Sequence, residues 1–451
     1  MTDMEEKIDL ARPVERALRL LSTMDVDVFD ISASYSRSLS ISLLGRGIKD
    51  AVSRTDLGMG VRVYKSRGMG VAFSQSLKPA DVEMTVQRAH SFARVAQPDP
   101  YFKGIPGPAK APEVPGLCDS EIVNLTLEEA GGFCKRMIDA VEKVHRGAMY
   151  MGGLSSNHSR GFLVTSTGVS YEAEKTSIST YIAPTFREGD DVGSSYEYDY
   201  GISLAEINFD EIGEKAAEKA LEQFGSKRIE SGILPLILTP DSASSLCFGL
   251  LGAISGESAV KGRTFASGCL RKQIAPEILE IDDDGTVPSA IASSTYDGEG
   301  VPRRPTRVIA KGTILTFLHN SYSAGIAGVE TTGHAQRMGY RGYVGAGPSN
   351  IRVKPGDSSL DEMIEGTKMG LLVTNASFFP NMVSGEFSTT IDEGFLIENG
   401  EKKHPVKNLM VGGHILDLYR SIESISKEGR TLGRGFFFPS IKARDVKLAG
   451  R

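Results

Sequence analysis

The sequence predicts an α+β fold with two domains: an N-terminal α/β sandwich-like domain over residues 1–225 and a mainly antiparallel, β-rich domain over residues 226–451. Three observations lead to this prediction. The 451 residues are more than one hydrophobic core usually organises. The first half mixes helical apolar spacing with strand-like alternation of apolar and polar residues. After Gly232 the sequence changes to short apolar runs separated by Gly and Pro, which indicates a strand-rich domain.

Helices and hairpins can be assigned along the first half. Apolar residues at helical spacing predict helices over residues 10–21, 79–96, 126–144 and 208–224. Thr126 and Glu129 have the spacing of a capping box, which supports the start of the third of these helices. Alternation in VDVFDISASY and SLSISLL predicts two strands of an antiparallel ribbon. Two hairpins are expected, one turning at Lys-Ser-Arg-Gly with Gly68 at positive φ, and one turning at residues 166–168.

A proline-rich segment over residues 97–116 divides the first half. Its six prolines exclude a regular helix or a central strand, so we expect an extended segment that crosses between two units. The second half begins after a boundary near residue 226 with the apolar strand ILPLILTP, and the stretch LCFGLLGAISGESAVKG follows it. One further helix is predicted near residues 358–369.

Composition and charge argue against several classes of function. The net charge is −6, and Lys and Arg form no basic block, so no nucleic acid partner is expected. No window approaches the ~18 apolar residues that span a bilayer, so no membrane association is expected either. The N-terminal stretch MTDMEEKIDLARPVERALRLL has no export pattern, and we expect a cytoplasmic protein. Four scattered cysteines predict neither a disulfide framework nor a thiolate zinc site.

Residues that bind metals or phosphates in other proteins form no complete motif here. No pair of the seven histidines has the i, i+4 spacing of a helical zinc site. Glu330 and His334 enclose Thr-Thr-Gly, which disfavours a helix, so a hydrogen bond in a loop or at a strand end is the expected role of His334. The repeated Gly-Met-Gly-Val is assigned to turn and strand geometry, because no helix opens after either copy. Ser255 lies in no GxSxG elbow.

Two groups of carboxylates are candidates for a metal or acid–base site. Residues 282–284 are three consecutive aspartates, but they lack the ligand spacing of a calcium loop, and a solvated turn is expected. Asp297 and Glu299 could work as an acid–base pair. We expect them instead to bind nearby arginines, namely Arg303, Arg304 and Arg307.

Five motifs of the second half follow one another in order: LHNSYSAGIAG, TTGHA, GLLVTN, EGFLIENGE and the closing KLAG. Together they resemble the TldD/PmbA family, once called modulators of DNA gyrase. SSTYDGEGVPRR, FLIENGEKKHPV and VGGHILDLYRSI resemble the PmbA branch, also called TldE. RSLSISLLGRGIKDAVSRTDLGMGVRVY resembles the shared N-terminal domain. The resemblance covers nearly the whole chain and is weakest across residues 97–116.

The resemblance implies a role beside a zinc peptidase. In the family, the TldD subunit carries HExxxH on a helix, binds zinc and hydrolyses peptides, whereas TldE pairs with it and lacks these ligands. A gapless match ending at residues 261–262 places the two histidine positions on Cys247 and Gly252, and the glutamate position on Phe248. Zinc needs three or more protein ligands, and Phe and Gly supply none. We expect no catalytic residue and no cofactor in this chain, and zinc in a TldD-type partner.

The matched stretch is expected to persist as a packing helix in which Gly249, Gly252 and Gly256 permit close backbone approach. Two places depart from the PmbA pattern: Asn375 stands where an acidic residue is expected, and residues 389–393 replace a glycine-rich run.

Three functions remain open from the sequence. The first is a non-catalytic subunit that pairs with a TldD-like homologue in a zinc metalloprotease acting on small or unfolded peptides. The second is a stand-alone homodimeric hydrolase with an unrecognised site, such as a metal at a dimer seam. The third is a peptide-binding or regulatory protein without peptidase activity. The candidates for substrate or partner contact are His319, Asn320, Tyr322, His334, Asn375 and His414.

Overall fold

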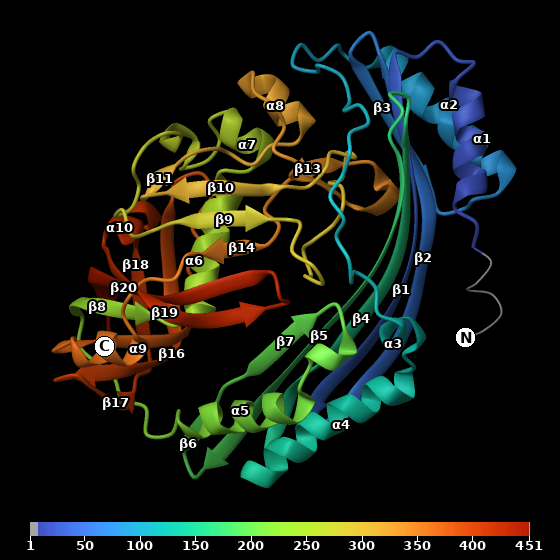
Figure 1. The fold of residues 1–451 in the computed structure, drawn as a ribbon. Helices are drawn as coiled ribbons and strands as arrows, with labels where there is room; N and C mark the ends of the chain where they lie inside the picture. Colours follow the sequence, from blue (N-terminus) through green and yellow to red (C-terminus); the bar gives the residue numbers. More distant parts are fainter. Residues whose placement is uncertain (1–7, 451) are drawn as a thin grey trace.

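The computed structural model describes residues 8–450 and contains two large β-sheets with helices packed against them (Figure 1). The first sheet is built from the chain between Val28 and Gly201, and the second from the chain between Gly232 and Ala449. The predicted α+β class with a β-rich C-terminal region is confirmed. The first seven residues of the N-terminal stretch, on which the absence of an export pattern was judged, lie outside the described residues.

Within residues 8–450, the first sheet has seven antiparallel strands in the order β3-β2-β1-β4-β5-β6, with β7 paired to β5. Its strands are β1 (Val28–Gly45), β2 (Gly47–Lys65), β3 (Gly68–Ser74), β4 (Met149–Thr165), β5 (Ser170–Glu188), β6 (Asp191–Ser194) and β7 (Glu197–Gly201). The helices of this half are α1 (Ala11–Leu21), α2 (Pro79–Val95), α3 (Ser120–Asn124), α4 (Leu127–Val144) and α5 (Phe209–Leu221), with a 3-10 turn η2 (Leu204–Glu206). The four predicted helices and the capping box of Thr126 and Glu129 are confirmed.

These helices cover one face of the first sheet, because the buried apolar side chains of β1 point to that face. Phe29 and Ile31 pack in the cluster with α1 and α2, and Leu39 and Ile41 pack in the cluster with α4 and α5. The apolar residues keep the same alternation in the two predicted strands, and no Gly or Pro lies between these strands. The two predicted strands are therefore one strand of 18 residues. The predicted ribbon is wrong in this respect: β1 pairs with β2 and β4.

The hairpin between β2 and β3 turns at Ser66 and Arg67, whose φ angles are 48° and 65°. The predicted role of Gly68 is therefore wrong, because Gly68 is the first residue of β3. A Cβ at Gly68 would lie 2.6 Å from the carbonyl oxygen of Ala93 on α2. The glycine allows the helix to pack against the strand.

The second domain begins with β8 (Gly232–Leu238), α6 (Pro240–Ala253) and α7 (Gly256–Val260). Its other strands are β9 (Ile281–Asp284), β10 (Pro305–Ala310), β11 (Thr313–Ile314), β12 (Ala335–Arg337), β13 (Val344–Ala346), β14 (Ile351–Val353), β15 (Met369–Ala376), β16 (Glu386–Glu398), β17 (Glu401–Pro405), β18 (Leu409–His414), β19 (Ile422–Leu432) and β20 (Phe436–Ala449). Its other helices are α8 (Ser321–Ala327), α9 (Leu360–Glu365) and α10 (Ile415–Arg420), with 3-10 turns η3 (Ser267–Cys269) and η4 (Gly339–Arg341). The predicted division near residue 226 falls between α5 and β8.

Five strands of the second sheet form a closed ring in the order β20-β18-β16-β15-β8, because β8 pairs with both β15 and β20. Strand pairing is mainly antiparallel, and β15–β8 and β14–β20 are parallel pairs. The helix predicted over residues 358–369 is shorter than expected, because Ser359 caps it and the chain enters β15 at Met369. None of the helices in the described part of the chain is long and apolar enough to cross a membrane.

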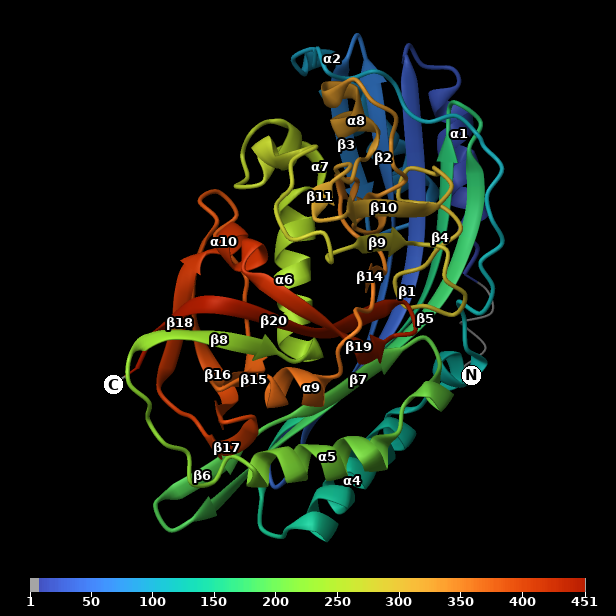
Figure 2. The same cartoon turned by 60° about the vertical axis from the view of Figure 1, so that its left-hand side comes forward.

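The second domain lies on the concave side of the long strands, opposite the helix-covered face (Figure 1, Figure 2). Tyr340 of η4 is fully buried against Gly60 of β2, where a Cβ would collide with the tyrosine carbonyl. Buried ion pairs lie beside it: Asp30 accepts from Arg337 at 3.0 Å and from Nε of Arg62 at 2.7 Å. The glycines of the first Gly-Met-Gly-Val thus serve packing between the domains.

The proline-rich segment contains no helix or strand, as predicted, and it connects α2 to α3 within the first half while lying between the two domains. Phe102 stacks on Tyr64 of β2 with 3.8 Å between ring centroids. Further along, the amide of Ser289 in the second domain donates to the carbonyl of Pro115 at 3.0 Å. The segment therefore contacts both domains along its length.

Candidate functional site

Helix α6 follows β8 directly and passes through the core of the second domain (Figure 2). Pro240 occupies its first turn, which suits proline because the amide there has no helical partner. Leu246 and Leu250 are fully buried in the large core cluster that includes residues of β8 and β20. The helix ends at Ala253, and Gly256, with a φ of 63°, begins α7. The three positions matched to the zinc motif all lie on α6.

These three positions do not supply ligands that converge on one zinc ion. Burial raises the pKa of the fully buried Cys247 thiol to about 12, so the side chain is neutral. Phe248 packs against Phe436 and Phe438 of β20, with ring centroids 5.5 and 5.8 Å apart. Gly252 has no side chain. One neutral thiol, a phenyl ring and a glycine do not fit the requirements of a structural or catalytic zinc site.

The glycines of α6 differ in what surrounds them. A Cβ at Gly249 would lie 2.8 Å from Cδ of Pro380, a rigid ring. A Cβ at Gly252 would meet only Cε of Met382, at 2.9 Å, and that side chain is 41% exposed. The expectation of close backbone approach is therefore wrong for Gly252, whose neighbour is a movable methyl group.

Four of the six contact candidates lie together around the start of α8. Asn320 caps this helix by accepting from the amide of Ser323 at 2.9 Å, and it donates to the carbonyl of Val344 in β13 at 3.1 Å. Tyr322 donates to Asp99 of the proline-rich segment at 2.6 Å. The short α8 thereby connects β13 to the crossing segment.

The two histidines of this group are buried and have separate partners. Nδ1 of His319 lies 3.2 Å from Oγ of Ser323, and burial, with His334 nearby, lowers the pKa of His319 to about 4. Nε2 of His334 lies 3.0 Å from Oδ1 of Asp283 in β9, and Oδ2 of Asp283 accepts from the amide of Ser349 at 2.7 Å. The predicted solvated turn at residues 282–284 is wrong, because these residues form a strand and Asp283 is fully buried.

A cavity of about 860 Å³ lies beside this group, between the two domains. Asn320 and Tyr322 line it from the second domain, and Arg62 lines it from β2. Met338 and Tyr343, which flank η4 and also line the cavity, are each 71% exposed. A cavity lined by both polar and apolar side chains can accept an extended peptide or a partner loop.

Asn375 and His414 lie elsewhere. Asn375 lines a different cavity of about 590 Å³ at the start of α6, where Tyr196 donates to its Oδ1 at 3.4 Å. His414 caps α10 by accepting from the amide of Leu416 at 3.2 Å, and its ring meets Phe265 edge to face. The structure thus brings together His319, Asn320, Tyr322 and His334 and leaves these two apart.

The carboxylates of SSTYDGEGVPRR bind backbone amides more than arginines. Asp297 accepts from the amides of Glu299, Val301 and Ala335 at 2.9–3.0 Å, and burial raises its pKa. Glu299 accepts from the amide of Ser321 at 2.8 Å and lies 3.5 Å from Arg62. Of the expected partners, Arg303 attracts Asp297 electrostatically but donates its hydrogen bond to Gly333. The other two were wrong: Arg304 donates to Thr331, and Arg307 pairs with Asp282 and Glu280.

A polar clamp at the start of α6 was not foreseen from the sequence. Arg430 of β19 donates to both oxygens of Asp241 in the first turn of α6, at 2.9 and 3.0 Å. It also bonds Glu197 of β7, and its guanidinium lies 4.4 Å from the ring centroid of Tyr198. These contacts hold α6 against β7 of the first sheet. The residues are 189 and 233 positions apart in the chain, so spacing gives no signal of the clamp.

Comparison with known families covers most of the chain. Residues 29–93, 121–224 and 231–450 match, respectively, domain 1, the central domain and the C-terminal domain of the PmbA/TldA metallopeptidase models. The chain belongs to the PmbA/TldD family. The resemblance inferred from the sequence motifs is therefore confirmed, and this is a metalloprotease-like protein by descent.

Individual relatives of the PmbA/TldD family carry both branch names. Metalloprotease PmbA of Escherichia coli O157:H7 is 27% identical over 98% of this chain and 96% of its own length. The zinc metalloprotease TldD homolog of Saccharolobus solfataricus is 26% identical over 62% of this chain and 66% of its own length. The crystal structure of TldE from Thermococcus kodakarensis superposes with a TM-score of 0.88 and 26% identity, covering 97% of this chain and all of that one.

Proposed function

We propose that this chain is a catalytically silent subunit of a PmbA/TldD-type zinc metalloprotease, and that it pairs with a TldD-like homologue. The observation that carries this proposal is the state of α6. The matched positions hold a buried neutral thiol, a phenyl ring and a glycine, so the helix can support the core but cannot hold zinc or a catalytic base. Zinc and the hydrolytic step belong to the partner in this proposal.

The contribution of this chain is a surface for the peptide substrate, formed by the cavity beside α8. Support comes from its lining: charged groups of both signs, hydrogen-bonding groups of Asn320 and Tyr322, and the exposed side chains of Met338 and Tyr343. Such a surface suits an unfolded peptide of mixed sequence, because main-chain and side-chain contacts are both available.

A hydrolase of its own that uses Ser323 and His319 is disfavoured. Ser323 is fully buried, and its hydroxyl lies between Nδ1 of His319 and the carbonyl of Asn320. A substrate carbonyl cannot reach a nucleophile that is closed off in this way.

The test of the proposal uses the full chain mixed with a TldD-like homologue from the same organism. We expect the two chains to form a complex that is visible by light scattering and to hydrolyse an unstructured peptide. Cys247→Ala should leave the kcat of the mixture unchanged, because the thiol is a core group. Tyr343→Ser should raise KM, whereas the control Phe92→Ser, at a 52% exposed position on α2, should not. A large loss of kcat with Cys247→Ala, or no complex, would contradict the proposal.

A further inference from the structure

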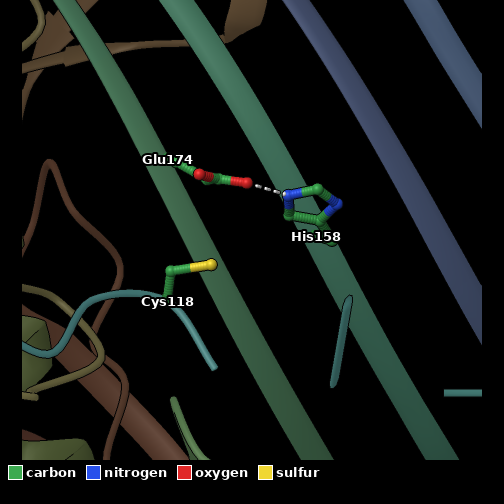
Figure 3. A group of neighbouring side chains, drawn as sticks. All are labelled: Cys118, His158 and Glu174. Atoms are coloured by element: carbon green, nitrogen blue, oxygen red, sulfur yellow. Dashed lines mark hydrogen bonds and ion pairs between the residues drawn. The ribbon is translucent and has the colours of Figure 1, made fainter. Parts of the chain in front are cut away.

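Three side chains that can bind metals converge on the first sheet (Figure 3). Cys118 lies at the end of the proline-rich segment, His158 on β4 and Glu174 on β5. One sulfur, one imidazole nitrogen and one carboxylate oxygen all lie within 4.8 Å of one another. Figure 3 shows the three side chains directed toward the same space.

The backbone fixes the position of Cys118. On the edge of β5 away from β4, no strand of the described chain pairs with Thr176, and the segment before α3 takes that place. The amide of Thr176 donates to the carbonyl of Leu117 at 3.0 Å, and the hydroxyl of Thr176 accepts from the amide of Asp119 at 2.9 Å. Both neighbours of Cys118 are therefore bound to one buried residue, and the thiol is held beside Glu174, two positions away on the same strand.

The hairpin fixes the other two groups. His158 pairs in register with Thr176, so Glu174 lies diagonally across the ladder. Nε2 of His158 is 2.7 Å from Oε1 of Glu174. The histidine side chain is 11% exposed and the glutamate side chain 48% exposed, so the group has a fixed inner ligand and an outer edge open to water.

The charge of the surroundings suits a cation. The carboxylates of Glu174 and Asp119 lie near the Cys118 thiol. Two arginines stand opposite the group in the strand register: Arg37, opposite His158, donates to the carbonyls of Val123 and Leu125, and Arg160, opposite Glu174, donates to Glu172 at 3.0 Å. A divalent cation would compensate the carboxylate and allow the thiol to release its proton.

We propose that Cys118, His158 and Glu174 bind one divalent metal ion of the zinc type, with water as the fourth ligand. Thiolate, imidazole and carboxylate together are the donor set that zinc accepts in tetrahedral sites. At Zn–S of about 2.3 Å and Zn–N of about 2.0 Å, ligand atoms stand roughly 3.5 Å apart, so the group needs shifts of about 1 Å or less. On binding, the thiol proton leaves to solvent, Nε2 of His158 gives up the proton that it shares with Glu174 while Nδ1 takes one up from solvent, and two metal bonds replace the hydrogen bond.

The site would attach the end of the crossing segment to the first sheet. Leu117 and Asp119 already lie against β5, and Asp119 continues into α3 as its N-cap. Metal binding to the folded chain alone stabilises it by mass action. This role is independent of peptide hydrolysis, because α6 and the cavity beside α8 lie in the second domain and at its interface.

Titration of the reduced, chelator-treated full chain with Co²⁺ tests the proposal, because a cobalt–thiolate bond gives charge-transfer absorption in the near ultraviolet. We expect one Co²⁺ per chain with this absorption, displaced by one Zn²⁺, and a higher melting temperature with Zn²⁺. Cys118→Ser should abolish the absorption. His158→Gln and Glu174→Gln should each weaken Co²⁺ binding by more than about 100-fold. A loss of this size exceeds that expected for a residue that only contacts a metal ligand.

The matched control is Cys269→Ser, which removes another partly accessible thiol and should change nothing. Absence of the thiolate absorption in the folded wild-type chain, or its persistence in Cys118→Ser, would overturn the proposal. Because this site would add zinc to the chain, the metal content of α6 is best measured in the Cys118→Ser background. That separation keeps the failure of this proposal distinct from the failure of the proposed function.

Discussion

Protonation of His319 provides a direct measure of how tightly the group around α8 is packed. The pKa of His319 is lowered from its ordinary value of 6.5 to about 4, first by burial and then by His334. The unfolded chain therefore binds a proton between pH 6.5 and about 4 that the folded chain does not bind. Stability from this group is present above pH 6.5 and is lost as the pH falls toward 4.

The size of the loss follows from the two pKa values. The difference between 6.5 and about 4 corresponds to about 3 kcal/mol in the free energy of unfolding. Other groups also titrate in this range, so the measurement is a comparison between the wild-type chain and His319→Gln. Urea unfolding near pH 7 and near pH 4 should show a fall that is about 3 kcal/mol larger for the wild type.

The control for this measurement is His90→Gln on α2, where the ring lies near the surface and Nε2 is 3.3 Å from the carbonyl of Asp25. This variant should keep the wild-type dependence on pH. An equal fall for the wild type and His319→Gln would show that His319 is not held neutral by its surroundings, and the packing argument for α8 would be wrong.

Two further predictions concern α6. Arg430→Met should lower the free energy of unfolding by about 3 kcal/mol in urea, because it leaves Asp241 without its cation and Glu197 with Lys219 alone. The control Arg434→Met, at a 58% exposed side chain, should cost less than about 1 kcal/mol, and equal losses would contradict the clamp. Gly252→Ala should stabilise the chain by up to about 1 kcal/mol through helix propensity, because only Cε of Met382 must move. Gly249→Ala should be less stable than Gly252→Ala in thermal unfolding because of the rigid ring of Pro380, and the reverse order would refute this account of the helix.

Local signals in the sequence predicted the elements whose causes are local. The capping box of Thr126 and Glu129 starts α4, and Pro79 starts α2, as expected from the sequence. The positive φ of Ser66 and Arg67 could not be predicted, because a glycine stands next to them and the packing of α2 demands it there. In the same way, three consecutive aspartates predict a turn, but in the structure they pair with β10 and β14 and form a strand.

The sites depend on contacts that are distant in the chain. Asp283 reaches His334 across 51 positions, and the sequence alone gives no reason to pair them. The pair of His158 and Glu174 did leave a signal: a hairpin that turns at residues 166–168 places residue 158 opposite residue 176. No signal in the sequence predicted the position of Cys118, because this position depends on hydrogen bonds between Thr176 and the backbone of Leu117 and Asp119.

A peptide hydrolysis assay tests the central claim most directly. It compares the full chain alone with its mixture with a TldD-like homologue, at equal total concentration and with Zn²⁺ present. The account predicts no hydrolysis by this chain alone and zinc-dependent hydrolysis by the mixture. Zinc-dependent hydrolysis by this chain alone, retained in the Cys118→Ser variant, would contradict it and would place a catalytic site outside α6.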